Sequence, residues 1–152
     1  MPPLPLQNSG LRLIGRMALH MIKLAVGAAS VEDMLAWRAA HSQPGAPWIM
    51  STRMTPKRGT ELLDGGSLYR VFKGVILCRQ RILAIQTVAE GVTARCEVTL
   101  EQTPVRVAPT PRRAFQGWRY LAAADAPPDL DEAAFGEVPA DLARQLRDAG
   151  AW

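Results

Sequence analysis

The sequence has few of the residues on which many kinds of site depend. Two cysteines and two histidines occur among 152 residues, and they form neither a CxxC nor an HxxxH spacing. A zinc site needs three or four such ligands at short spacings, so we expect no metal. Cys78 and Cys96 lie in apolar runs and are predicted to be small core residues. Neither a GxGxxG pattern nor a P-loop occurs, and we expect no cofactor.

Long apolar runs are also missing. A membrane span needs roughly 20 consecutive apolar residues, and every stretch here is far shorter. Arg12 and Arg16 follow the first short apolar stretch instead of preceding it, which is the wrong order for a signal peptide. We therefore expect a cytoplasmic protein with no membrane partner. Residues 1–16 are expected to be a disordered extension or a mis-assigned start, with translation beginning at Met17.

Charge is plentiful but unevenly distributed. Residues 53–119 carry twelve Lys or Arg against five Asp or Glu, a net +7, whereas residues 120–152 carry two against seven, a net −5. A basic body favours an anionic partner, and the alternative is that the acidic tail folds back on this body. The length suits one domain. We expect a basic α+β domain over 17–124, followed over 125–152 by an acidic linker and a C-terminal helix that packs on the same domain.

Periodicity and capping signals predict the secondary structure. Ser30 and Asp33 form a variant capping box at the start of a helix. Thr55 and Pro56 occupy the N-cap and first-turn positions of a second helix, which Gly65 and Gly66 would end. The buried stripe of the first helix would consist of Val31, Met34, Leu35 and either Trp37 or Ala39. Strands are expected over 18–26, 48–54, 67–73, 75–88, 92–100 and 115–121, with an extended stretch over 103–111.

These elements predict an α+β fold with a mixed or antiparallel curled sheet and two or three short helices. Apolar and polar residues alternate strictly over 92–100, which indicates one buried face. Gly91 stands where a turn would join this strand to 75–88 in a hairpin. The sheet could curl into a small barrel.

Two blocks of sequence carry a resemblance to a known family. The motifs are TPKR (55–58), LLDGGSLY (62–69), RQRIL (79–83) and FQGWRYL (115–121). On these the chain, from about Met17 to its end, resembles an uncharacterised alphaproteobacterial family classed as a domain of unknown function. The resemblance implies no activity. The order of elements is also similar to ASCH and PUA-like β-barrels, which bind RNA or modified nucleosides, and this second likeness is one of architecture alone.

Three constellations could bind an anion. Lys57 and Arg58, at the predicted helix start after Thr55, oppose the helix dipole unless a phosphate binds there; the alternative is that both reach toward Glu61. Alternation places Arg79 and Arg81 on one strand face with Leu77 and Leu83. These arginines point into a groove or toward solvent, or they pair with Glu97 or Glu101. A bulge near Gln80 would change which face they occupy.

The third constellation is a basic and aromatic segment. Single-stranded nucleic acid is held by cations on its phosphates and by rings on its bases. Residues 111–120 interleave both kinds of side chain, namely Arg112, Arg113, Phe115, Trp118, Arg119 and Tyr120. The alternative is that Phe115 and Trp118 belong to the core and the arginines are solvated.

The function hypotheses follow from these constellations, because no catalytic set emerges. His20 and His41 lie in a strand and a loop without a nucleophile beside them, and both are read as ordinary core or surface residues. The leading hypothesis is an RNA-binding module with a basic groove. The alternative is an enzyme that acts on a phosphorylated or nucleoside-type small molecule, and it requires a closed pocket with a perturbed titratable group. The predicted phosphate-binding residues are Thr55, Lys57, Arg58, Arg79, Arg81, Arg112, Arg113, Trp118 and Arg119.

Overall fold

The computed structural model describes residues 18–89 and 91–130, and these form a seven-stranded mixed sheet with two α-helices. The α+β prediction is therefore confirmed. The strands are β1 (His20–Leu24), β2 (Trp48–Thr52), β3 (Ser67–Phe72), β4 (Val75–Val88), β5 (Arg95–Leu100), β6 (Val105–Pro111) and β7 (Trp118–Leu121). The helices are α2 (Val31–His41) and α3 (Gly59–Leu63), with short 3-10 turns η1 (Gly91–Thr93) and η2 (Ala123–Asp125).

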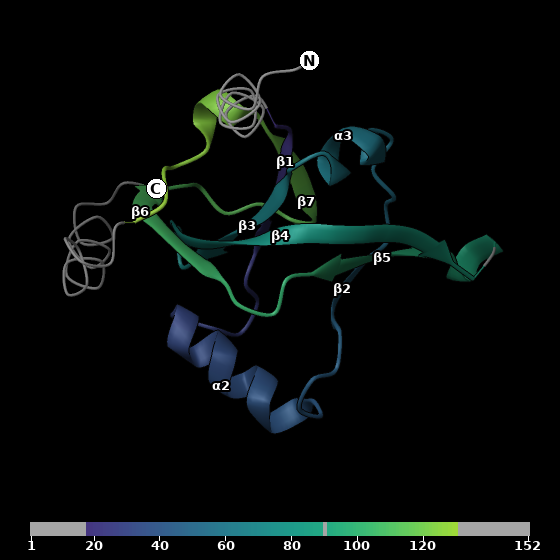
Figure 1. Ribbon diagram of the computed structural model, residues 1–152, viewed down its shortest axis with the longest axis horizontal. Coiled ribbons are helices and arrows are strands. Elements are labelled where there is room, and N and C mark those ends of the chain that lie inside the picture. The colour runs from purple at the N-terminus through teal and green to yellow at the C-terminus, as the bar shows by residue number, and fades with distance from the viewer. Residues whose placement is uncertain (1–17, 90, 131–152) are drawn as a thin grey trace, which may run out of the picture.

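The sheet is built around the long strand β4 (Figure 1). Its strands follow the order β2-β5-β4-β3-β1-β7, and β6 also pairs with β4. The first half of β4 pairs with β3 and β6, and its second half pairs with β5. The sheet stays open, so the predicted barrel does not form. An open path that ends in β2 and β7 leaves no pair to close the ring.

Hairpins and one parallel pair set the register. The turn between β3 and β4 consists of Lys73 and Gly74, both with positive φ, as a tight hairpin turn requires. The predicted hairpin of β4 and β5 is present, with a 3-10 turn at Gly91. β1 runs parallel to β3 and antiparallel to β7, which gives it neighbours on both sides.

The two faces of the sheet carry separate apolar clusters. Successive residues of β3 point to opposite sides, and Leu68 and Phe72 belong to one cluster while Tyr69 and Val71 belong to the other. The first cluster packs under α2 and α3 and includes both buried free cysteines, as predicted. The second cluster lies beneath β6 and residues 115–126. All six residues of β3 are buried as a result.

The helix α2 begins as the sequence predicts. The Ser30 side chain accepts a hydrogen bond from the Asp33 amide at 3.1 Å, and the Asp33 carboxylate accepts one from the Ala29 amide. Its buried stripe is narrower than predicted, however. Val31 and Met34 are buried, whereas Leu35 is 38% exposed and Trp37 is 62% exposed. The buried residues of α2 therefore lie in its first turn.

The start of α3 corrects the prediction at Thr55 and Pro56. The helix begins at Gly59, and Arg58 occupies the N-cap without a side-chain cap. The preceding backbone is held by tertiary partners, because Met54 accepts from the Trp118 indole and the Arg58 amide donates to the Tyr120 hydroxyl. These contacts take the segment away from helical geometry. The predicted helix end is confirmed, with Gly65 at φ +88°.

The segment after β7 returns to the sheet. Asp129 forms a β-bridge with Val107, and the Leu130 amide donates to the Arg106 carbonyl. The predicted acidic linker therefore starts as a docked segment. The expected N-terminal extension and the C-terminal helix lie outside the described residues. None of the helices in the described ranges is long and apolar enough to cross a membrane.

Candidate functional site

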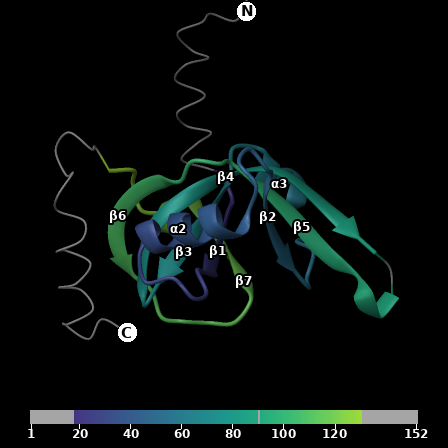
Figure 2. The ribbon, with the colours of Figure 1, turned by 90° about the horizontal axis from the view of Figure 1, so that it is seen from below.

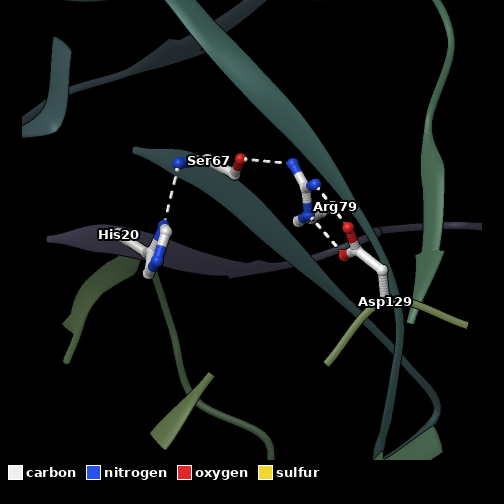
Figure 3. Close-up of polar contacts among 4 residues, drawn as sticks. All are labelled: His20, Ser67, Arg79 and Asp129. Atoms are coloured by element: carbon white, nitrogen blue, oxygen red, sulfur yellow. Dashed lines mark hydrogen bonds and ion pairs between the residues drawn. The ribbon is translucent and has the colours of Figure 1, made fainter. Parts of the chain in front are cut away.

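A polar cavity of about 430 Å³ opens on the face of the sheet that carries the second apolar cluster. Its polar wall is formed by His20 of β1, Ser67 and Tyr69 of β3, Arg79 of β4 and Asp129. Figure 3 shows how these strands bring four of the five side chains together. Alanines and prolines of residues 123–128 form the opposite wall.

Strand register explains why these residues meet. In the parallel pair of β1 and β3, Met21 lies opposite Leu68, so His20 lies beside Ser67. In the antiparallel pair of β3 and β4, Tyr69 lies directly opposite Arg79. The close approach of β1 depends on Gly66, where a Cβ would lie 2.3 Å from the Leu19 carbonyl oxygen. Any other residue would push the start of β1 away.

Arg79 is the central cation of the cavity. Its Nε and Nη2 atoms donate to the two Asp129 carboxylate oxygens, each at 2.7 Å. Its Nη1 atom donates to the Ser67 hydroxyl at 3.0 Å. The hydrogen bonds with Asp129 raise the pKa of Arg79. The guanidinium is therefore fixed, and the bound carboxylate balances its charge.

His20 is neutral near pH 7. Its Nδ1 atom accepts a hydrogen bond from the Ser67 amide at 3.0 Å, so the ring proton sits on Nε2. Burial, followed by the charge of Arg79, lowers the pKa of His20 to about 4. Nε2 makes no hydrogen bond to the described residues. Every fully buried side-chain nitrogen in those residues has a hydrogen-bond partner, so Nε2 must be accessible to solvent. The Nε2–H group therefore faces the open cavity.

Tyr69 adds a second neutral donor. Its ring packs edge-on against His20, with ring centroids 5.0 Å apart. Burial raises the pKa of Tyr69 to about 12, so the hydroxyl keeps its proton. The hydroxyl makes no hydrogen bond to the described residues, in which every fully buried side-chain oxygen has a partner, so it is open to the cavity. The wall thus presents an imidazole N–H, a phenol O–H and a serine O–H beside one guanidinium.

This arrangement suits stabilisation of negative charge better than attack by a nucleophile. Ser67 has no base at its hydroxyl, because His20 is bonded to the Ser67 amide. A neutral imidazole with a depressed pKa can act as an electrophilic donor toward a carbonyl or phosphoryl oxygen. Among the described residues, no group of three His, Cys, Asp or Glu side chains could hold a metal ion.

Comparison with known proteins gives a family and no activity. The model of the family described as Protein of unknown function (DUF1489) matches residues 21–152. The chain belongs to this family. The resemblance drawn from the TPKR, LLDGGSLY, RQRIL and FQGWRYL motifs is thereby confirmed at the level of an uncharacterised family. Neither a curated protein nor a solved structure matches the chain.

The DUF1489 match contains four of the five residues of the polar wall, and His20 lies one residue before the match begins. Sequence reasoning named Arg79 but read His20 as an ordinary residue and assigned no role to Ser67, Tyr69 or Asp129. A polar His20 within an apolar strand was the available signal. The role of Asp129 depends on a long-range return of the chain that no local pattern encodes.

The predicted phosphate site at the start of α3 is not formed as a helix N-terminus. Thr55 shares a hydrogen bond with the Thr87 hydroxyl at 3.0 Å. Arg58 pairs with Glu61, with Nε–Oε1 and Nη2–Oε2 distances of 2.8 and 2.6 Å, and also lies over the Tyr120 ring. For Arg58, this pair is the alternative in which the side chain reaches toward Glu61. Lys57 is exposed and makes no side-chain hydrogen bond to the described residues.

Arg79 and Arg81 meet different surroundings. Arg79 pairs with Asp129 rather than with Glu97 or Glu101, and Arg81 is exposed. The expectation that both share a face with Leu77 is wrong, because β4 carries a register shift at Leu77. Leu77 packs with the first apolar cluster instead, on the side opposite the polar cavity.

The basic and aromatic segment divides between core and surface. Trp118 is 9% exposed and its indole donates to the Met54 carbonyl at 2.9 Å, which is the core alternative. Phe115 is half-buried, and the guanidiniums of Arg112 and Arg119 lie 5.9 and 5.1 Å from its ring centroid. Arg113 is exposed. Of the predicted cations, Arg79 lines the polar cavity, whereas Arg112 and Arg119 lie beside the Phe115 ring.

Proposed function

We propose that this DUF1489 protein binds and acts on a small phosphorylated molecule, such as a nucleotide or sugar phosphate, in the polar cavity. The observation that carries the proposal is the chemistry of the cavity wall. The donors of His20, Ser67 and Tyr69 converge beside Arg79, while the acceptor, Asp129, is already bonded to Arg79. A wall of donors recognises a ligand rich in acceptors.

The reaction class that fits this wall is one in which negative charge builds on a ligand oxygen. Neutral N–H and O–H donors in a partly closed site stabilise such charge without having to reorganise. Asp129 remains half-exposed, and it is the carboxylate that could accept a proton once ligand takes over Arg79. Both cysteines are free and buried, which supports the reducing cytoplasm that we propose as the location of this protein.

Calorimetric titration with AMP, ribose 5-phosphate and inorganic phosphate tests the proposal. We expect saturable binding of at least one organic phosphate, weakened about tenfold in Arg79→Gln because one charge-assisted contact is lost. Asp129→Asn should bind more tightly, because it frees the guanidinium. Arg113→Gln, an exposed cation that does not line this cavity, is the matched control. Absence of binding, or equal affinity of Arg79→Gln and the wild type, would contradict the proposal.

RNA binding remains a second candidate, which one observation favours. Arg112 and Arg119 flank the half-buried Phe115 ring, and neither forms an ion pair within the described residues. The described ranges carry fourteen Lys or Arg against eight Asp or Glu, a net +6. Unpaired cations beside a ring are suited to the phosphates and bases of a single strand.

Fluorescence anisotropy with mixed-sequence RNA and single-stranded DNA tests this second candidate. We expect affinity that falls steeply with salt, and a salt slope reduced by about one for each phosphate-contacting arginine replaced among Arg112, Arg113 and Arg119. Arg53→Gln, an exposed cation outside the predicted phosphate-binding set, is the control. Affinity weaker than about 100 μM at low salt for both nucleic acids would exclude RNA binding at this surface.

A further inference from the structure

A second cavity lies on the opposite face of the sheet, beneath α2. It has a volume of about 320 Å³, within the range of small-molecule sites. The loop between β1 and α2, one side of α2, Trp48 of β2 and Arg70 of β3 form its walls. Figures 1 and 2 show α2 alongside this face of the sheet. Because Tyr69 and Arg70 are neighbours on β3, they point to opposite sides, and the two cavities are separate.

Arg70 is the unusual residue of this cavity. Its side chain is 8% exposed, and its Nε atom donates to the buried Gln80 amide oxygen at 3.0 Å. The two terminal nitrogens make no hydrogen bond or ion pair with the described residues. Every fully buried side-chain nitrogen in those residues has a hydrogen-bond partner. The terminal nitrogens of Arg70 are therefore accessible, and they reach the open cavity that Arg70 lines. A guanidinium keeps its charge even where burial disfavours it.

The walls contain no carboxylate to balance this charge. None of the lining residues is Asp or Glu, and the second cation of the wall, Arg38, is bonded to the Ser42 hydroxyl, the Ala46 carbonyl and Gln102. A buried cation is normally paired, because leaving its charge uncompensated away from water is costly. The electrostatics of the cavity therefore favour an anionic ligand.

Flat apolar surfaces surround the charge. Arg38 lies 4.7 Å from the ring centroid of Trp48, which is itself buried. Trp37 and His41, which also line the cavity, stack with ring centroids 4.1 Å apart and nearly parallel rings. Trp37 is exposed and is not part of the apolar core, so its ring is accessible to a ligand. Rings of this kind hold a planar group through stacking and apolar contact.

We propose that this cavity binds a small anion that carries a flat ring, with its carboxylate or phosphate on Arg70 and its ring between Trp48 and the Trp37–His41 pair. The ligand is a small molecule, because α2 covers the cavity and leaves room for one ring and one anionic group. This site does not depend on the function proposed for the polar cavity, which lies on the other face and uses none of the same residues.

Titration of the full chain with four probes tests the proposal. Phenyl phosphate and benzoate carry both features, whereas inorganic phosphate lacks the ring and benzamide lacks the charge. Tryptophan fluorescence and calorimetry should show at least one ringed anion binding about tenfold or more tightly than either incomplete probe. The better of the two anions identifies phosphate or carboxylate as the anionic group. Failure of both to saturate by about 10 mM would overturn the proposal, since binding that weak falls below about 3 kcal/mol.

Two variants locate the binding. Arg70→Met removes the charge at similar length and should weaken the ringed anion about tenfold or more. Ala28→Leu keeps every polar group in place and should abolish binding of the ringed anion by filling the cavity. This variant keeps the test decisive if Arg70→Met does not fold. Arg53→Met, an exposed cation outside the lining, and Arg79→Gln in the other cavity should leave affinity unchanged. Unchanged affinity in Ala28→Leu, or equal loss in Arg53→Met, would refute the assignment.

Discussion

The buried His20 makes the stability of the fold depend on pH in a window that can be calculated. Burial and the charge of Arg79 lower the pKa of His20 from 6.5 to about 4. Between these values the unfolded chain binds a proton that the folded protein does not bind. The free energy of unfolding therefore rises with pH across the window. The contribution is fully present above pH 6.5 and is lost progressively as the pH falls toward 4.

The size of the effect follows from the two pKa values. One pKa unit corresponds to about 1.4 kcal/mol, so the interval from 6.5 to about 4 is worth about 3 kcal/mol. His20 is 5% exposed, and solvent screening therefore reduces this figure little. Protonation would also require Nδ1 to carry a proton, which would break the hydrogen bond from the Ser67 amide. The expected loss is a large part of the stability of a domain of this size.

Urea denaturation at intervals from pH 7.5 to 4 compares the wild type with His20→Asn. An asparagine Oδ1 can accept from the Ser67 amide as Nδ1 does, but it does not titrate. We expect the wild type to lose about 3 kcal/mol more than His20→Asn over this range. Carboxylates that titrate near pH 4 contribute equally to both proteins, so the difference isolates His20. Parallel pH profiles would refute the assignment of a neutral buried imidazole.

Three further substitutions test other parts of the structure by chemical denaturation. Gly66→Ala should destabilise the fold by about 3 kcal/mol or more, because its Cβ would meet the Leu19 and Leu62 carbonyl oxygens at 2.3 and 2.4 Å; a loss below about 1 kcal/mol would contradict this packing. Ser30→Ala should cost about 1 kcal/mol through loss of the α2 cap, and Ser30→Asp should restore it. Asp129→Ala should cost about 1 kcal/mol and increase proteolysis after residue 122, whereas an unchanged digest would show that the return segment does not depend on this pair.

Local rules were sufficient where the chain acts on its near neighbours. The Ser30 cap, the Gly65 helix end and the hairpin that turns near Gly91 each depend on residues within a few positions. The alternation that predicts β5 is also present in the structure, where Cys96, Val98 and Leu100 are buried at every second position. In these cases propensity, capping and burial all favour the same structure, so the sequence pattern is reliable.

Local rules failed where a distant segment supplies the deciding contact. The helix signal at Thr55 and Pro56 is overridden because β7 provides partners for Met54 and Arg58, more than sixty positions along the chain. The side of the sheet on which Arg79 lies depends on a bulge at Leu77, and no residue type in β4 indicates that bulge. Such contacts offset an intrinsic helix preference that is worth only tenths of a kcal/mol per residue.

The polar cavity could not be predicted for the same reason. Its residues come from three strands and from a segment that returns after η2, and each looks ordinary in its own context. Sequence reasoning searched for cations gathered in one run, and it found Arg79 within such a run. The structure instead pairs that cation with Asp129, from the stretch where the net charge turns negative.

The alternation of β3 explains how one short strand can serve two sites. Ser67 and Tyr69 face the polar cavity, whereas Arg70 faces the cavity beneath α2. Both sets are held in place by the pairing of β3 with β1 and β4. Arg70 and Tyr69 also differ in what they need: the phenol is neutral and tolerates burial, whereas the guanidinium is charged and requires a counterion. The face beneath α2 is therefore the one on which a bound anion would balance a buried charge.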